Sequence, residues 1–225
     1  MTWLFNPPAP VALSIIGRQA LFPVRRILCV GQNYAAHARE MGADPTREAP
    51  FFFAKPCDAL TTEAEVPFPS ATENLHHEVE LVCAIGGEGA DLSPAAAGNL
   101  IIGWAVGVDL TRRDIQAEAK SRGRPWDASK GFDHSAPCGP LTLGALPNPG
   151  GAIALAVNGE MRQSARLDQM IWSPAEVVAQ ASRLWRLMPG DLIFTGTPEG
   201  VGPVVRGDRI EAAIAGLAPL TFTLT

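Results

Sequence analysis

Three carboxylates in this chain of 225 residues could form a metal site. Glu78 and Glu80 are separated by one residue, so on a strand both would point to the same face, roughly 7 Å apart. Asp109 ends the apolar run 100–108, where a strand would leave the core. Neighbouring carboxylates near a core repel each other and are costly to desolvate without a counter-charge. This set of oxygen ligands suits Mg²⁺ or Mn²⁺, with Ca²⁺ possible.

The same residues also fit ordinary structural roles. A solvent-exposed strand face would account for Glu78 and Glu80, because charged side chains are mostly solvated. Asp109 could be a turn residue or the cap of a following helix. His77 alternates onto the apolar face of the strand, so we expect a histidine packed in the core rather than a ligand.

A second group of residues could activate water. His37 and Glu40 are three residues apart, so on a helix they share a face and come within hydrogen-bonding reach. A histidine that is oriented by a carboxylate is a common general base near neutral pH. An exposed helix pair would have the same spacing. Lys130, which stands next to Gly131, would by itself be interpreted as a surface lysine.

Many short elements are expected to position these residues, because 20 prolines and 22 glycines interrupt the chain. The apolar patterns predict strands at 27–30, 51–54, 78–85, 100–109, 192–194, 209–214 and 219–225, with an edge strand at 11–16. Asn158-Gly159 predicts a two-residue hairpin. Strands outnumber helices and often follow one another directly, which favours a strand-rich α+β domain over a nucleotide-binding βαβ fold.

Helix starts are marked by capping residues. Ser93-Pro94 predicts a short helix with proline at its first position, and Thr111 with Asp114 is expected to cap a helix after Asp109. Ser173 and Glu176 form a capping box. The helix that follows is amphipathic, and its apolar side is formed by Val177, Val178, Ala181, Leu184 and Trp185.

Composition and charge exclude several classes of protein. A net charge of −5 with few basic clusters argues against nucleic acid binding. The only basic clusters are 112–113 and 120–124, which we expect to be solvated unless some of their arginines hold an anionic substrate. No apolar stretch is long enough to span a membrane, and the N-terminus lacks the pattern of a secretory signal. The four scattered cysteines are expected to be free thiols in a cytoplasmic protein.

Six ordered segments resemble the fumarylacetoacetate hydrolase family, in particular its short, single-domain acylpyruvase and fumarylpyruvate hydrolase branch. They are the segments 27–37 (ILCVGQNYAAH), 52–56 (FFAKP), 76–81 (HHEVEL), 107–111 (GVDLT), 123–130 (GRPWDASK) and 190–202 (GDLIFTGTPEGVG). The resemblance extends from about residue 25 to residue 214. Residues 1–24 are predicted to form an N-terminal arm. The resemblance implies a catalytic domain, residues 25–225, that folds as a mixed β-sandwich roll and forms a homodimer.

The resemblance also assigns roles to residues. It implies that Glu78, Glu80 and Asp109 bind Mg²⁺ or Mn²⁺. It implies that His37 and Glu40 form the catalytic dyad on a segment that closes over the ligand, and that Lys130 is the active-site lysine. The residues implied to contact substrate are Arg113, Gln116, Thr195, Gly196 and Thr197. Gln32 departs from the pattern, because related chains usually carry Arg or Lys there, and this leaves the substrate preference open.

The implied activity is hydrolysis of a carbon–carbon bond in an acylpyruvate, with fumarylpyruvate of gentisate-type aromatic catabolism as the expected substrate. His37, held by Glu40, would take a proton from the attacking water, and Lys130 would stabilise the enolate that leaves. Oxaloacetate decarboxylation and dienedioate isomerisation are alternatives within the family. A decarboxylase needs no attacking water, so the intact dyad favours hydrolysis over decarboxylation. A catalytically silent 2-oxo acid binding protein is a further alternative, since a fold does not fix a function.

Overall fold

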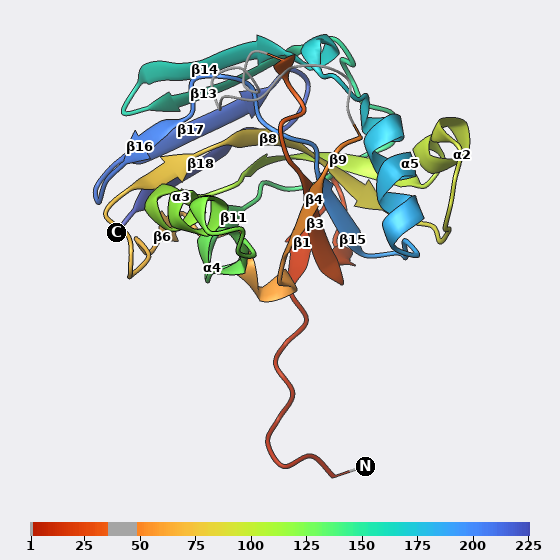
Figure 1. The fold of residues 1–225 in the computed structure, drawn as a ribbon. Helices are drawn as coiled ribbons and strands as arrows, with labels where there is room; N and C mark the ends of the chain where they lie inside the picture. The colour runs from red at the N-terminus through yellow and green to blue at the C-terminus, as the bar shows by residue number, and fades with distance from the viewer. Residues whose placement is uncertain (1, 36–48) are drawn as a thin grey trace.

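A six-stranded mixed sheet forms the centre of the protein in a computed structural model, which describes residues 2–35 and 49–225 (Figure 1). Its strands, in spatial order, are β12 (Thr142–Leu143), β9 (Ile101–Val108), β8 (Val79–Ile85), β15 (Asp191–Phe194), β3 (Arg26–Val30) and β4 (Phe52–Lys55). Only β15 and β3 run parallel to each other; the other neighbours are antiparallel. The predicted strands at 27–30, 51–54, 78–85 and 192–194 are therefore confirmed to within a few residues.

A five-stranded sheet packs against the first. Its strands, in spatial order, are β14 (Glu160–Arg166), β13 (Ala152–Val157), β17 (Arg209–Ile214), β18 (Leu220–Leu224) and β6 (Glu65–Val66). Side chains from both sheets, such as Leu81, Val106, Leu155 and Phe222, share one buried core. The predicted hairpin is also present: Asn158 and Gly159 both have positive φ, at 53° and 80°, as a tight turn between twisted strands requires.

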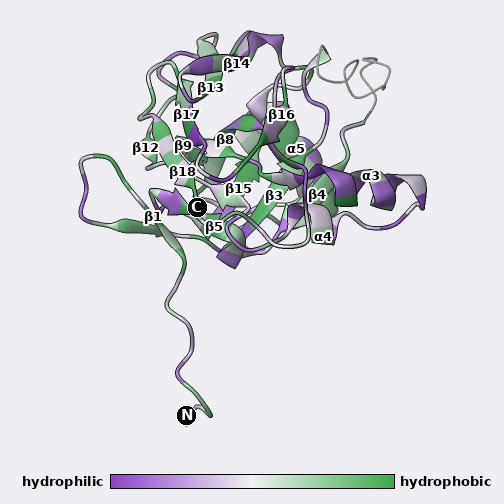
Figure 2. Ribbon diagram, turned by 90° about the vertical axis from the view of Figure 1, so that its left-hand side faces the viewer, coloured by the Kyte–Doolittle hydropathy of each residue, from purple (hydrophilic) through white to green (hydrophobic). Residues whose placement is uncertain are grey.

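The second face of the central sheet is also covered. Val82 and Ala84 of β8 belong to another buried cluster, which includes Leu13 and Phe22. Those two residues come from a hairpin of β1 (Ala12–Ser14) and β2 (Leu21–Pro23), part of the predicted arm. Because both faces of β8 are buried, the alternative of a strand with one solvent face is wrong. Figure 2 shows the central strands in hydrophobic green.

Small sheets and helices complete the fold. Besides the β1–β2 hairpin, two small sheets are present in the described residues. One contains β10 (Thr111–Arg112), β7 (Leu75–His77) and β16 (Gly202–Val204), and the other contains β11 (Ala136–Pro137) and β5 (Leu60–Thr61). The helices are α2 (Pro94–Gly98), α3 (Arg113–Ser121), α4 (Asp127–Lys130) and α5 (Pro174–Leu184), with short 3₁₀ turns η1 (Cys57–Ala59) and η2 (Leu167–Gln169). The strand-rich α+β prediction is confirmed.

Helix starts were predicted with mixed success. Ser93 caps α2 through a bond from the Ala96 amide, and the Ser173 amide donates to Glu176 in the capping box of α5. The predicted cap at Thr111 is wrong, because Thr111 lies in β10 and its hydroxyl donates to the Asp109 carbonyl. Leu184 was expected on the buried side of α5 but is 61% exposed, although Ala181 in the same turn is buried and Trp185 packs against the core.

All four cysteines are free. Among the residues that the structure describes, no helix combines the length and the hydrophobicity needed to cross a bilayer.

Close packing around Gly107 should make a β-carbon costly there. A Cβ at Gly107 would lie 2.6 Å from both Phe194 and Val82, which are buried on either side. We expect Gly107→Ala to lower the free energy of unfolding by about 1–3 kcal/mol, as overpacking usually does. Gly98→Ala is the control, because its Cβ would meet only Ala175 at 3.4 Å on a helix that favours alanine. Equal stability of the two variants in urea unfolding would contradict the expectation.

Candidate active site

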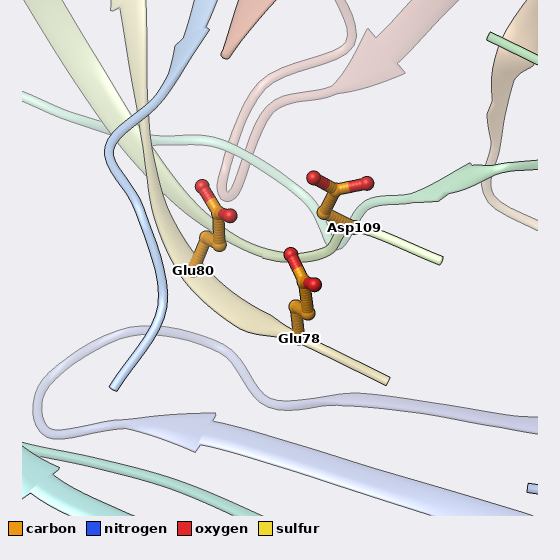
Figure 3. A group of neighbouring side chains, drawn as sticks. All are labelled: Glu78, Glu80 and Asp109. Atoms are coloured by element: carbon orange, nitrogen blue, oxygen red, sulfur yellow. The ribbon is translucent and has the colours of Figure 1, made fainter. Parts of the chain in front are cut away.

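The three predicted carboxylates converge at one end of the central sheet (Figure 3). Glu80 lies on β8, Glu78 immediately precedes that strand, and Asp109 follows β9. The antiparallel register pairs Val79 with Val108, and the Asp109 amide donates to the Glu78 carbonyl over 2.8 Å, so the strand ends are held together. One oxygen of each residue lies within 4.8 Å of the others, and all three side chains are buried.

Two lysines and an arginine form ion pairs with two of the three carboxylates, Glu78 and Asp109. Lys130, at the end of α4, donates to Glu78 Oε2 over 2.8 Å and to Asp109 Oδ2 over 2.7 Å. The Lys55 Nζ atom lies 2.8 Å from Asp109 Oδ1 and forms an ion pair with it. That oxygen accepts no hydrogen bond from the described residues. Arg113, in the first turn of α3, pairs with Glu78 Oε1. Lys130 is therefore part of the site rather than a surface lysine.

Burial and charge set the protonation of these groups. Burial by itself would lower the pKa of Lys130, but the carboxylates of Asp109 and Glu78 outweigh it and raise the pKa above the ordinary value. Its side chain is therefore an ammonium ion at neutral pH. Burial raises the pKa of Glu80 well above its usual range, and the negative charges of Asp109 and Glu78 raise it further.

Glu80 is the residue whose surroundings point to a metal ion. Its Oε2 accepts a hydrogen bond from the Gly196 amide over 2.7 Å, but no cation of the described residues pairs with it. A divalent ion among the three carboxylates would supply that missing charge, and carboxylate oxygens are the donors that Mg²⁺ and Mn²⁺ prefer. The residues present therefore fit such an ion. Because the ion has to displace the proton that the raised pKa favours on Glu80, its affinity should increase with pH.

A pocket opens over the carboxylates. Three of the predicted substrate residues line it, Arg113, Gln116 and Thr197, and Arg113 Nη1 donates to Gln116 Oε1 over 2.6 Å. The other two are not in the pocket wall. Gly196 holds Glu80 through its amide, and the Thr195 hydroxyl donates to the Leu81 carbonyl over 2.8 Å, so both fix the position of β8.

The predicted dyad is not part of this description, because His37 and Glu40 lie outside the described residues. Gln32, which was singled out as a departure, does line the pocket, with its backbone at a φ of 57°. His77 is buried as expected, and its Nδ1 lies 3.1 Å from Gln163 Oε1, whereas its Nε2 has no partner among the described residues. Burial lowers the pKa of His77, so the ring is neutral.

Two residues of this region, Lys55 and Gln163, were not predicted from the sequence. Lys55 is buried, and the one signal in the sequence was that it belongs to a segment that carries the family resemblance. Gln163 is fully buried and bonds the Val79 amide, the Thr197 hydroxyl and the Pro198 carbonyl. It joins the metal-site strand to the pocket wall across the sandwich, and nothing in its local sequence indicated that contact.

Comparison with known proteins agrees with this geometry. The model of the fumarylacetoacetate (FAA) hydrolase C-terminal family matches residues 26–225. The crystal structure of fumarylpyruvate hydrolase from Pseudomonas aeruginosa in complex with Mn²⁺ and pyruvate is 52% identical, with a TM-score of 0.96, over 100% of this chain and 99% of the other. A Ralstonia fumarylpyruvate hydrolase is 43% identical over 183 residues, 80% of this chain and 95% of its own. The mitochondrial oxaloacetate tautomerase of Homo sapiens is 41% identical over 201 residues, 88% of this chain and 90% of its own.

Metal binding at the carboxylates should stabilise the fold. Because the ion binds the folded chain, a concentration of 100 times its dissociation constant should add about 2.7 kcal/mol. We expect Mn²⁺ to raise the melting temperature of the chelator-treated protein, and Glu80→Gln to remove most of that increase. Glu88→Gln is the control, because Glu88 pairs with Arg186 on the surface. An undiminished Mn²⁺ response in Glu80→Gln would show that the ion binds elsewhere.

Proposed function

Because this chain belongs to the fumarylacetoacetate hydrolase family, we propose that it hydrolyses fumarylpyruvate to fumarate and pyruvate with Mg²⁺ or Mn²⁺ as cofactor. The observation that carries the proposal is the buried cluster of Glu78, Glu80 and Asp109 with Lys130 against it, at the base of a pocket. The chain that shares this fold at 52% identity is a fumarylpyruvate hydrolase whose crystal structure contains Mn²⁺ and pyruvate. The reaction is a hydrolysis of a carbon–carbon bond in a ketonic substrate.

The proposed reaction adds water to the distal carbonyl of the 1,3-diketo acid. His37, oriented by Glu40, takes a proton from that water, which is the usual role of such a pair. The bond between the acyl carbon and the methylene then breaks, its electron pair stays on the pyruvate part as an enolate, and a proton converts the enolate to pyruvate. When bound, the divalent ion supplies Lewis-acid polarisation of the 2-oxo acid.

Lys130 is the residue of the described chain that suits charge stabilisation. Its ammonium group lies within 2.8 Å of two carboxylates, so its charge is retained although the side chain is buried. A fixed cation in such surroundings stabilises an oxyanion without reorganising during the reaction. Arg113 and Gln116, joined by a hydrogen bond in the pocket wall, are proposed to orient the substrate, as is Thr197.

An oxaloacetate activity is the second candidate, because an oxaloacetate tautomerase is 41% identical over most of this chain. Tautomerisation, like decarboxylation of oxaloacetate, requires no attacking water. An isomerase of a dienedioate is a third relative, at 33% identity. The dyad residues His37 and Glu40, present in the sequence, favour the hydrolase.

The cellular setting is part of the proposal. We infer a homodimer in the cytoplasm that acts in gentisate-type aromatic catabolism. The acidic composition and free cysteines are consistent with that compartment. The division into an arm, residues 1–24, and a catalytic domain, residues 25–225, stays a prediction.

The activity should depend on the metal and on a 1,3-diketo acid. We expect Mg²⁺ or Mn²⁺ to support loss of the ultraviolet absorbance of fumarylpyruvate, and a chelator to abolish it reversibly. Acetylpyruvate and oxaloacetate serve as parallel substrates, with pyruvate release measured by a coupled assay. Turnover of oxaloacetate alone would transfer the proposal to the second candidate.

The dyad should matter for chemistry but not for metal binding. We expect His37→Ala to lower kcat by about 10²- to 10⁴-fold, the usual contribution of a general base, while the Mn²⁺-induced rise in melting temperature persists. His134→Asn is the control, because His134 lies outside the pocket wall and its φ of 59° is one that asparagine tolerates. Full hydrolase activity in His37→Ala would remove the dyad from the mechanism.

A further inference from the structure

The outer part of the active-site pocket carries a lysine that the mechanism does not use. Lys120 lies in the last turn of α3 and lines the same pocket as the three carboxylates. Phe51, Phe53 and Trp126 line it as well. The Phe51 and Trp126 rings meet edge to face with centroids 5.3 Å apart, and Lys120 Nζ lies 5.9 Å from the centroid of Trp126. An ammonium group at an aromatic ring is thus presented to the pocket.

The other cations of the pocket are already paired. Arg113 is bound to Glu78, and Lys130 is bound to Glu78 and Asp109. Gln32, also in the pocket wall, is neutral. Lys120 forms no ion pair with any carboxylate of the described residues, so its charge is available to a ligand.

The basic residues next to Lys120 along the chain differ from it. Arg122 and Arg124 lie 3.1 Å and 3.8 Å from the same carboxylate oxygen of Glu118, and neither lines the pocket. Those two fit a solvated basic surface, as expected from the sequence. Lys120 combines a place in the pocket wall with a charge that no carboxylate of residues 2–35 and 49–225 pairs with, and this combination points to a ligand.

The chemistry of acylpyruvates supplies a group for this position. The pyruvate end of the substrate has to reach the carboxylate cluster at the base of the pocket, so the acyl group extends towards the outer wall. In fumarylpyruvate the acyl group ends in a second carboxylate, whereas in acetylpyruvate it ends in a methyl group. We propose that Lys120 binds the distal carboxylate of a dianionic acylpyruvate, with Phe51 and Trp126 beside the planar enoyl chain, and so sets the preference for that substrate class. This inference rests on the proposed function.

A contact that stabilises the bound substrate and the transition state equally should change KM and leave kcat unchanged. We expect Lys120→Met to raise KM for fumarylpyruvate about five- to tenfold, the value of a charged hydrogen bond at a position that solvent reaches, with kcat nearly unchanged. The kinetic constants for acetylpyruvate should stay within about threefold of wild type, because the lost charge has no partner there. Lys120→Arg should restore most of the preference, and Arg122→Met should leave both substrates unaffected.

Two stable ligands test the same contact without turnover. 2-Oxoheptanedioate has the chain length and both terminal carboxylates of fumarylpyruvate, and 2-oxoheptanoate lacks the distal one. Calorimetry with Mg²⁺-loaded protein should show tighter binding of the dianion, and Lys120→Met should weaken only that ligand.

The outcomes separate this inference from the proposed function. Equal losses for both substrates and both ligands in Lys120→Met would overturn the role of Lys120, even with an active hydrolase. A wild-type protein that does not hydrolyse fumarylpyruvate would overturn the proposed function. In that case a selective loss of 2-oxoheptanedioate binding would still support Lys120 as the distal carboxylate site, and an unselective one would overturn it.

Discussion

The burial of three carboxylates at the end of a sheet is the constraint on which the rest of this structure depends. Carboxylates in a poorly solvated site are expensive unless opposite charges and hydrogen bonds compensate them. Lys55, Lys130 and Arg113 supply three positive charges to Glu78 and Asp109, but in the described residues Glu80 receives only a backbone amide. That unequal compensation is why burial raises the pKa of Glu80, and why the site has a place for a divalent cation.

The central sheet makes this arrangement rigid because both of its faces are covered. One face of β8 packs against the five-stranded sheet and the other against the β1–β2 hairpin side of the molecule. A shift of one residue in the register would exchange the two faces and move Glu80 away from Asp109. The register is fixed by apolar packing along the whole strand, and Gly107, directly opposite Glu80, has no room for a side chain. The geometry of the ligands is therefore a consequence of the core.

Local patterns predicted the elements and the carboxylates well, because those features depend on neighbours in the sequence. The alternation of polar and apolar residues around Glu78 and Glu80 reflects a single strand. The apolar run before Asp109 reflects another. Contacts across the sandwich were not predictable in this way. Gln163 is 84 residues from Val79, and its amide group meets β8 only after two sheets have packed. Thr111 failed as a predicted cap because pairing of β10 with β7 outweighs a local capping preference.

The three lysines near the carboxylates differ in how deeply they are buried, and their roles differ accordingly. Lys55 and Lys130 are almost fully buried, and removing either would take away one of the two lysines that compensate the buried Asp109, a change that destabilises the fold. Any effect of those residues on the reaction is therefore tied to the integrity of the fold. Lys120 lies at the exposed edge, where solvent weakens its interactions and no described carboxylate depends on it. A residue in that position can change the range of acyl groups accepted while the buried charges, the sheet register and the three carboxylates stay as they are.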